Sequence, residues 1–286
     1  MNKILILIVA LTGVYSHSVY AQFNIFGNKK EKLKAYDKIE KLARKEVSGM
    51  VMSKNNSEVF WIHGDSGTKN KIYAINRSGK LVEEDGLQLK GIKNKDWEDI
   101  TSDDEGNIIV ADIGNNCKCR TDLSLIIVSD VDEGLSETEN FKILRIEYPK
   151  KNSILKLVGN SSPNAEAIFY LDGIYIITKE ARGRNTKLYK LESTDFTKVN
   201  MLVDIESFDF GNKVTAADVS PDKKLLAVLT DKSLRVFEIN TPTSFFEKEV
   251  FSADFKADQV ESVAFDSDSS VIIAEEKGDL YRVKLF

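Results

Sequence analysis

Acidic residues recur at matching places in five copies of a short pattern, and this spacing could build a metal site. Each copy has a small or acidic residue, one further residue and an aliphatic residue, followed by a turn and a hydrophobic stretch. The copies lie at residues 46–50, 96–100, 164–168, 215–219 and 259–263. If each copy opens an equivalent unit of a repeat, its acidic side chains face those of the other copies across one axis. Carboxylates gathered in this way repel each other unless a cation neutralises them.

Calcium is the cation that such a set of oxygen ligands favours, because it accepts six to eight oxygens in loose geometry. Glu98, Glu166 and Glu261 align with one another, and Ser48 and Ala217 fill the same place in the other two copies. One position further on are Asp99 and Asp218. An alternative is that these acids bond to backbone amides or pair with lysine and arginine. The predicted metal ligands are Glu98, Asp99, Glu166, Asp218 and Glu261.

A second set of polar residues follows the apolar stretch of each copy, where a strand would meet solvent. In the segment 112–116, a glycine permits a tight turn and two asparagines offer donors and acceptors, with Arg120 close by to orient a carboxylate or phosphate. A turn-stabilising role for the same residues is equally open. We expect the set to bind a small polar or anionic ligand through His63, Asp112, Asn115, Asn116, Arg120, Lys179, Glu180 and Glu276.

Motifs for nucleophilic catalysis are missing from the sequence. It contains no Gly-x-Ser-x-Gly, no His-Glu-x-x-His and no phosphate-binding glycine loop. His63 is one of only two histidines, and a lone histidine at a strand end is more often a surface residue than a general base. Carboxylate and metal chemistry is therefore the more plausible enzymatic route.

The elements that must position these residues are β-hairpins. Asp, Asn, Gly and Pro follow each copy at the turn, and a second apolar stretch comes next. Third strands are expected at 71–75, 187–191, 233–237 and 279–283, and fourth strands at 142–148, 199–205 and 245–251. The copies are 44 to 68 residues apart, and a four-stranded propeller blade takes about 40–50 residues.

These spacings predict an all-β fold, a β-propeller of five four-stranded blades. A six-bladed ring would need one more blade, and a two-sheet sandwich would not explain five copies in register. The last copy has room for only three strands, so we expect residues 23–45 to supply the fourth and close the ring. Residues 31–44 also fit an amphipathic helix, which is the alternative.

The N-terminus indicates export. Lys3, an apolar run over residues 4–14 and small residues before Gln22 predict a signal peptide at 1–21, cleaved after Ala21. An N-terminal segment, 22–45, and a propeller domain, 46–286, would follow. The chain is expected to be secreted or periplasmic, monomeric and without a membrane span, and its net charge of −5 argues against a nucleic-acid partner.

The two cysteines, Cys117 and Cys119, are separated by a single residue. In an oxidising compartment they could form a loop disulfide or remain free thiols. They could also contribute to a metal site, but no histidine or further cysteine is near them in the sequence to complete one.

The repeats resemble the SdiA-regulated family of bacterial extracytoplasmic propellers, in residues 46–50, 165–168, 178–180 and 260–263. Residues 97–100 and 111–116 with Arg120 are similar to secreted propellers grouped as esterase-like or phytase-like. The resemblance covers about residues 46–286 and implies a propeller, often with bound calcium, whose biochemical role is mostly unassigned. Ser48 and Ala217 depart from a fully acidic ring.

Two functions follow from these patterns. The leading hypothesis is a secreted propeller with a calcium site at its channel mouth that binds a small polar or anionic ligand or a protein partner. The competing hypothesis is a metal-assisted hydrolase of esters, lactones or phosphate esters, which rests mainly on the resemblance, and a fold does not by itself specify a function.

Overall fold

The structure, a computed structural model, describes residues 37–38, 46–129, 131–149, 162–180, 185–256 and 259–286. Within these ranges the chain is all-β: strands β1 to β21 are connected by turns and loops, without a helix. The described residues contain no helix long and apolar enough to cross a membrane. The predicted signal peptide lies outside the described residues, as does the predicted helix at 31–44 apart from residues 37–38.

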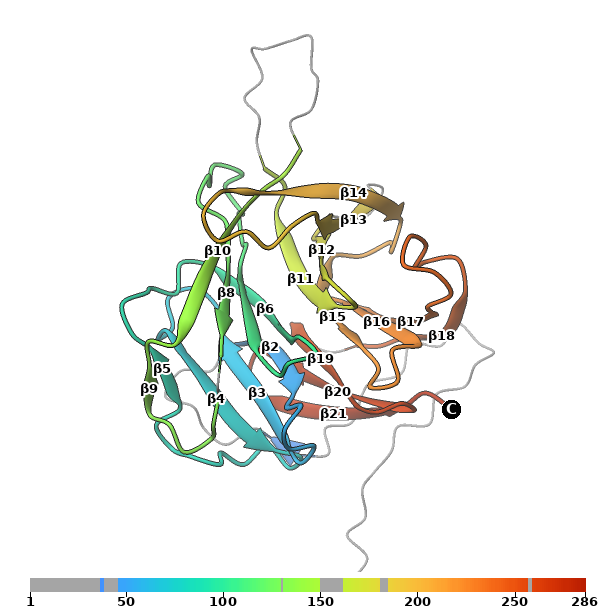
Figure 1. The fold of residues 1–286 in the computed structure, drawn as a ribbon. Coiled ribbons are helices and arrows are strands. Elements are labelled where there is room, and N and C mark those ends of the chain that lie inside the picture. Colours follow the sequence, from blue (N-terminus) through green and yellow to red (C-terminus); the bar gives the residue numbers. More distant parts are fainter. Residues whose placement is uncertain (1–36, 39–45, 130, 150–161, 181–184, 257–258) are drawn as a thin grey trace, which may run out of the picture.

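The strands form five successive groups of antiparallel neighbours (Figure 1). The first group is β2 (Val47–Met52), β3 (Val59–Gly64), β4 (Lys71–Asn76) and β5 (Leu87–Leu89), with the short β9 (Glu137–Thr138) added in parallel. The second is β6 (Trp97–Ser102), β7 (Ile108–Asp112), β8 (Ser124–Val128) and β10 (Phe141–Glu147).

The third group is β11 (Ala165–Tyr170), β12 (Ile174–Thr178), β13 (Thr186–Leu191) and β14 (Asn200–Phe208). Because β10 and β14 pair in parallel, the second and third groups join into one eight-stranded sheet. The fourth is β15 (Val214–Val219), β16 (Leu225–Thr230), β17 (Ser233–Glu238) and β18 (Glu249–Asp254). The fifth is β19 (Val260–Ser267), β20 (Ser270–Glu275), β21 (Asp279–Lys284) and β1 (Asp37–Lys38).

The N-terminal segment supplies the outer strand of the last group. Asp37 pairs with Leu280 and Lys38 with Asp279, antiparallel to β21. The prediction that residues 23–45 contribute a strand beside the C-terminal one is confirmed for these two residues. Residues 37–38 and the C-terminal strand β21 thereby lie in one sheet.

The first strand of each group, β2, β6, β11, β15 or β19, is called an inner strand below. Each inner strand contacts the next, and β19 contacts β2, so the five form a closed cycle. Figure 1 shows them gathered in the middle of the molecule, with the later strands of each group further out.

Five apolar cores fill the spaces between successive groups. One core joins the first and second groups, the next three join the second through the fifth, and the last returns from the fifth group to the first. Strands β7 and β12 are buried along their whole length because they are covered on both faces. This cyclic packing is compatible with a β-propeller.

The hairpin turns follow from their residue types. In the turn after β6, Gly106 has a φ of +84°, which glycine adopts without steric cost. The Asp103 carboxylate accepts a hydrogen bond from the Asn107 backbone N–H at 2.8 Å. Polar turns of this kind end each inner strand and send the chain back antiparallel to it.

One predicted fourth strand begins later than expected. Residues 245–251 were predicted to form it, but β18 begins at Glu249. The Glu206 carboxylate instead accepts hydrogen bonds from the backbone N–H groups of Phe245, at 2.7 Å, and Phe246, at 3.4 Å. Both rings are buried in the core between the third and fourth groups. Packing of these side chains therefore keeps the segment before Glu249 out of the strand.

Every inner strand carries a bulge at its second residue. The pairing with the next strand skips one residue near the start of each hairpin, and a bulge of this kind re-aims the skipped side chain. The skipped residues are Ser48, Glu98, Glu166, Thr215 and Glu261. The alignment that placed Ala217 level with Glu98 is therefore wrong by two residues. Thr215 holds that position, and Asp218 lies three residues beyond it.

Candidate functional site

Three of the five bulge residues are glutamates whose side chains act on one another. The end of the inner strands that carries the bulges is called the bulge end, and the opposite end, at the hairpin turns, the turn end. Burial raises the pKa of Glu261 to about 7, and the charge of Glu166 adds to this shift. Burial also raises the pKa of Glu98, again with Glu166 as the next cause. The charge of Glu166 therefore acts on both Glu98 and Glu261.

Lys179 lies among these glutamates. Its Nζ is 2.7 Å from Glu166 Oε2, and the charges of Glu98 and Glu261 also raise the pKa of Lys179. Glu166 accepts a further hydrogen bond from Asn164 Nδ2 at 2.8 Å. Lys179 and Asn164 thus hold the Glu166 carboxyl group beside Glu98.

A tighter cluster forms where Glu98 meets two loop aspartates. Carboxylate oxygens of Asp65, Asp96 and Glu98 lie within 4.8 Å of one another, and such a group could hold a metal ion. Asp65 follows β3, Asp96 precedes β6, and Glu98 is the bulge residue of β6. The last is nearly buried and the two aspartates are partly exposed, so the cluster opens toward solvent.

The backbone at Gly114 approaches this cluster closely. A Cβ atom on Gly114 would overlap Glu98 Oε1 and the Asp96 carboxylate. The Gly114 N–H donates to the Asp96 carbonyl oxygen at 3.1 Å, which fixes the approach. Glycine is therefore required here by space, and the two carboxylates are held in place against the main chain.

The donor set fits calcium better than zinc or magnesium. All three ligands are carboxylates, whereas zinc prefers nitrogen and sulfur. Calcium accepts oxygens at about 2.3–2.6 Å in flexible geometry, which suits carboxylates contributed by two loops and a strand. Magnesium, at about 2.0–2.1 Å, requires a tighter octahedron.

Burial and mutual repulsion raise the pKa values of two carboxyl groups in this cluster, Asp96 and Glu98. Burial raises the pKa of Asp96, and the neighbouring Asp65 raises it further. The same two causes, burial and nearby carboxylates, act on Glu98. Because a bound cation favours the ionised forms, it would displace protons from these groups.

Asp99, a predicted metal ligand, bonds to backbone instead. Its Oδ1 accepts from the N–H of Ile100 at 2.9 Å, and its Oδ2 accepts from those of Ile168 at 3.0 Å and Ala217 at 3.3 Å. It is completely buried. Asp99 therefore connects three inner strands, β6, β11 and β15, through their backbone N–H groups.

Asp218, the other predicted aspartate ligand, is also bonded to backbone. Its Oδ2 accepts from the N–H of Phe265 on β19 at 2.8 Å. Asp218 lies three residues beyond the bulge residue Thr215, toward the turn end, and is therefore not level with the glutamates. For both aspartates, the structure has the backbone bonding that was the alternative to a metal.

The sequence suggested that His63 is a surface residue, but the structure places it in the interior. It is fully buried, opposite Gly49 in the pairing of β2 with β3, and its ring meets that of Trp97 edge-on with centroids 5.7 Å apart. A Cβ on Gly49 would lie 2.6 Å from His63 Nε2, so the glycine gives the ring its space. Burial lowers the pKa of His63, which keeps the ring neutral near pH 7.

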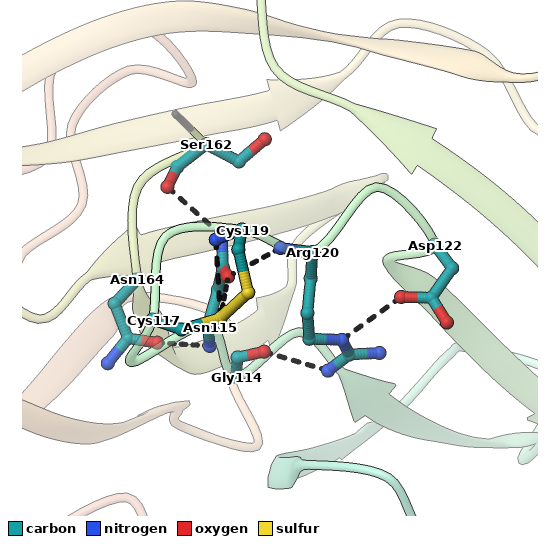
Figure 2. Close-up of a disulfide and its surroundings, with 8 residues drawn as sticks. All are labelled: Gly114, Asn115, Cys117, Cys119, Arg120, Asp122, Ser162 and Asn164. Carbon is teal, nitrogen blue, oxygen red and sulfur yellow. Dashed lines mark hydrogen bonds and ion pairs between the residues drawn. A yellow bond between two sulfur atoms is a disulfide. The ribbon is translucent and has the colours of Figure 1, made fainter. Parts of the chain in front are cut away.

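The predicted anion-orienting segment is a closed hydrogen-bonded loop (Figure 2). Asn115 is fully buried, with its side-chain oxygen accepting from the Arg120 N–H at 2.9 Å and its Nδ2 donating to the Ser162 carbonyl oxygen at 3.0 Å. Cys117 and Cys119 form a disulfide across the exposed turn of this loop. The turn-stabilising interpretation of Asn115 thus agrees with its contacts.

Arg120 is already occupied by this loop and its neighbours. Its guanidinium pairs with Asp112 at 2.9 Å and Asp122 at 3.1 Å, and donates to the Gly114 carbonyl oxygen at 2.7 Å. Figure 2 shows the guanidinium directed at Gly114 and Asp122. Arg120 therefore anchors the loop that carries Gly114 against the acidic cluster.

The remaining predicted ligand residues lie near the bulge end. Asn116 is exposed and accepts a hydrogen bond from Asn164 Nδ2 at 3.2 Å. Glu180 and Glu276 are partly exposed, and burial, followed by the charges of Glu46 and Asp65, raises the pKa of Glu276. Of the predicted binding set, Lys179 and Glu276 act through their charges on glutamates of the inner strands, and Arg120 and Asp112 act on Asp96.

Asp65 and Asp96 were not predicted as ligands, although both stand beside residues that were. The run Asp96-Trp97-Glu98-Asp99 places three acids within four residues, and this was the available signal. Which of these acids lie together depends on the bulge in β6. The bulge places the Glu98 side chain beside Asp96, whereas the Asp99 side chain faces the other inner strands.

No protein family and no curated protein matches this chain. Among solved structures, hydrazine synthase of Kuenenia stuttgartiensis is 8% identical, with a TM-score of 0.46, over 82% of this chain and 70% of that one. PorZ, a surface component of the type-IX secretion system of Porphyromonas gingivalis, is 10% identical, with a TM-score of 0.42, over 85% and 25%. The extracellular domain of BT4673 from B. thetaiotaomicron is 14% identical, with a TM-score of 0.41, over 87% and 28%. Similarities this distant carry no argument about function.

Proposed function

We propose that the chain is a five-bladed β-propeller that binds calcium at its bulge end and uses the ion to hold a ligand. The five-blade assignment is supported by the closed cycle of inner strands and by the five cores between successive groups. A two-sheet sandwich would bury one shared core between its sheets. The bulge at the same position of every inner strand is a further sign of a repeat.

The calcium ion would be held by Asp65, Asp96 and Glu98. The observation that carries this assignment is the approach of their oxygens to within 4.8 Å, against a glycine that leaves room for the carboxylates. When ionised, carboxylates this close repel one another, and burial together with the neighbouring carboxylates raises the pKa of Glu98 and Asp96. A bound cation would relieve this repulsion by taking the place of the protons.

The ligand would be a small polar or anionic group, or an acidic side chain of a protein partner. Bound calcium would supply a positive charge with room for oxygen ligands beyond the three carboxylates. Lys179, which is partly exposed and pairs with Glu166 at 2.7 Å, would donate a further hydrogen bond to the ligand. The charge of the calcium ion favours carboxylates and phosphates as ligands.

A thermal-melting experiment tests this function. Protein freed of metal with a chelator should melt at a higher temperature once calcium is added, because a ligand of the native state stabilises it. The Glu98→Gln variant should lose most of this shift, whereas Glu105→Gln, an exposed residue in the turn after β6, should keep it. Equal shifts in both variants, or none in the wild type, would overturn the proposal.

Metal-assisted hydrolysis of esters, lactones or phosphate esters is the second candidate, and one observation favours it. The pKa of Glu261 is raised to about 7, so this carboxyl group can accept or donate a proton near neutral pH. Calcium would polarise the ester or phosphate oxygen. Turnover of p-nitrophenyl esters or phosphates that is lost with a chelator and in Glu261→Gln would support it, and calcium-dependent melting without turnover would favour binding alone.

Export to an oxidising compartment is part of the same proposal. The predicted signal peptide at 1–21 motivates it, and the disulfide between Cys117 and Cys119 is in keeping with it, since structural disulfides are rare in the cytosol. Such compartments can also supply the calcium. Detection of a mature N-terminus at Gln22 in an exported fraction would test this part.

A further inference from the structure

The disulfide between Cys117 and Cys119 lies on an exposed turn and contributes little to the stability of the fold. Both cysteines are exposed, and so is Lys118 between them. A ring closed over one intervening residue removes little conformational entropy from the unfolded chain. Exposed or strained disulfides are more easily reduced than buried ones, and the labile and catalytic disulfides are of this kind.

The residue between the two sulfur-bearing positions has an unfavourable backbone conformation. Lys118 has a φ of +54°, in the left-handed region, which is costly for a residue that carries a Cβ. Its N–H donates to the Asn115 carbonyl oxygen at 2.8 Å, which holds it in this turn. Backbone strain of this kind concentrates at functional sites. The disulfide therefore closes a ring that contains a strained residue.

Cys117 has hydrogen-bond partners ready for its reduced forms. The Cys119 N–H lies 3.3 Å from Cys117 Sγ and would stabilise a thiolate there. Asn115 Oδ1 is 3.6 Å from the same sulfur and would accept from its thiol. Cys119 Sγ makes no hydrogen bond of its own in the described part of the chain. Since the better-stabilised thiolate leaves faster, Cys117 is the leaving sulfur and Cys119 the sulfur that is attacked.

The turn is held in place by bonds that do not involve sulfur. Asn115 accepts from the Arg120 N–H at 2.9 Å and donates to the Ser162 carbonyl oxygen at 3.0 Å. The Arg120 guanidinium donates to the Gly114 carbonyl oxygen at 2.7 Å, and Figure 2 shows these bonds around the disulfide. The sulfur–sulfur bond can therefore open and close while the rest of the loop stays bonded, as reversible exchange requires.

We propose that Cys117 and Cys119 form a thiol–disulfide exchange site that oxidises the paired thiols of a polypeptide substrate. A substrate thiolate attacks Cys119 Sγ, the bond between the two protein sulfurs breaks, and Cys117 leaves as a thiolate. The second substrate thiolate then attacks the substrate sulfur of this mixed disulfide and releases Cys119. Two electrons pass from the substrate to the cysteine pair, and the two protons of the substrate thiols end on Cys117 and Cys119.

This activity goes beyond the proposed calcium-dependent function and does not rest on it. Equilibration with glutathione is its first test. The chain is held without oxygen in about 5 mM reduced and 1 mM oxidised glutathione, a mixture in which catalytic disulfides are partly reduced. Alkylation of free thiols followed by mass spectrometry should find both cysteines reduced in at least about a tenth of the chains. A disulfide that serves only as a cross-link stays almost wholly oxidised in this mixture, and that result would overturn the proposal.

Transfer of the disulfide to a reduced peptide with two cysteines tests the reaction itself. The oxidised wild type, mixed with the peptide under argon, should form the peptide disulfide and lose its own in equal amounts. The Cys117→Ser/Cys119→Ser variant is the matched control and should form no more peptide disulfide than buffer does. No transfer by the wild type, or the same transfer by both proteins, would refute the exchange site.

Single variants test which sulfur leaves. In Cys119→Ser, the remaining Cys117 keeps the N–H of residue 119 as its donor, whereas Cys119 in Cys117→Ser has no such donor. Cys117 should therefore react with iodoacetamide at pH 7 at least about threefold faster than Cys119. Equal or reversed rates would contradict the assignment of Cys117 as the leaving sulfur. Both positions are exposed, so serine should leave the fold intact.

Discussion

Gly114 lies against the carboxyl group of Glu98, where a Cβ atom would overlap Oε1. The main chain of the disulfide loop and the bulge residue of β6 are therefore in direct contact. Arg120 holds the loop from the other side through the Gly114 carbonyl oxygen, at 2.7 Å. The position of the acidic cluster thus depends on a loop more than ten residues further along the chain.

Substitution of Gly114 by alanine should disturb this contact. The added methyl group must push Glu98 or Asp96 aside, and overpacking of this kind costs about 1–3 kcal/mol. Urea unfolding should show this loss, and calcium affinity should fall with it. Gly134→Ala, in an exposed turn where a Cβ would meet only Asp132 Oδ1 at 3.2 Å, is the matched control. If the two variants behave alike, the close contact at Gly114 has no energetic role.

Substitution of Asp99 by alanine should destabilise the fold without removing calcium binding. Three buried backbone N–H groups would lose their acceptor, and each unsatisfied group costs about 1–3 kcal/mol. The free energy of unfolding should therefore drop by at least about 3 kcal/mol, whereas the exposed Asp85→Ala should change it little. Calcium titration of the variant, below its melting temperature, should still give binding. If Asp99→Ala lost calcium binding while its free energy of unfolding stayed unchanged, Asp99 would be a metal ligand.

Reduction of the disulfide should have a small effect. The ring closed by Cys117 and Cys119 spans one intervening residue, and the loop-entropy relation gives about 2 kcal/mol or less for so short a loop. Asn115 and Arg120 also hold the loop independently of the sulfur atoms. The Cys117→Ser/Cys119→Ser double variant should keep its fold and calcium binding, as judged by near-ultraviolet circular dichroism and melting. Global unfolding on reduction would contradict this account of the loop.

Asp218 should make stability depend on pH. Burial raises its pKa from the ordinary value of 3.8 to about 7, so between these values the folded chain binds more protons than the unfolded one. Its contribution to the free energy of unfolding therefore falls as the pH rises from about 4 to 7, by about 1.4 kcal/mol for each pKa unit of the shift. Above about pH 7 it levels off.

The matched experiment compares the wild type with Asp218→Asn, which cannot ionise but keeps one oxygen acceptor. Because other buried carboxyl groups give slopes of the same sign, the informative quantity is the difference between the two proteins. The variant should gain stability relative to the wild type as the pH rises from 4 to 7. A difference that is independent of pH would show that Asp218 has an ordinary pKa in the folded chain.

Much of the fold could be predicted from local residue types. Turn residues and alternating apolar stretches recur in every copy, and they placed the hairpins near their observed positions. The start of β18 was missed because Phe245 and Phe246 pack into a core and their backbone bonds to Glu206, a contact 39 residues or more away. Sequence pattern alone carries no such information.

The site was predictable only in part, and the bulges explain why. Thr215 was misaligned because two alanines follow it, and either could occupy an apolar position of the strand. A one-residue bulge reverses which neighbours of a strand residue face the same way. The sequence alone therefore could not show that the carboxyl group of Glu98 lies beside those of the loop residues Asp65 and Asp96, and that Asp99 is not part of this cluster.

Calorimetric titration of calcium into metal-free protein tests the central claim most directly. We predict one calcium ion bound per chain, with protons released from Glu98 and Asp96 so that binding strengthens as the pH rises. Asp65→Asn and Asp96→Asn should each lose most of the affinity, while Asp104→Asn, at the turn end, should keep it. Absence of binding by the wild type, or equal binding by all of these variants, would contradict the calcium site.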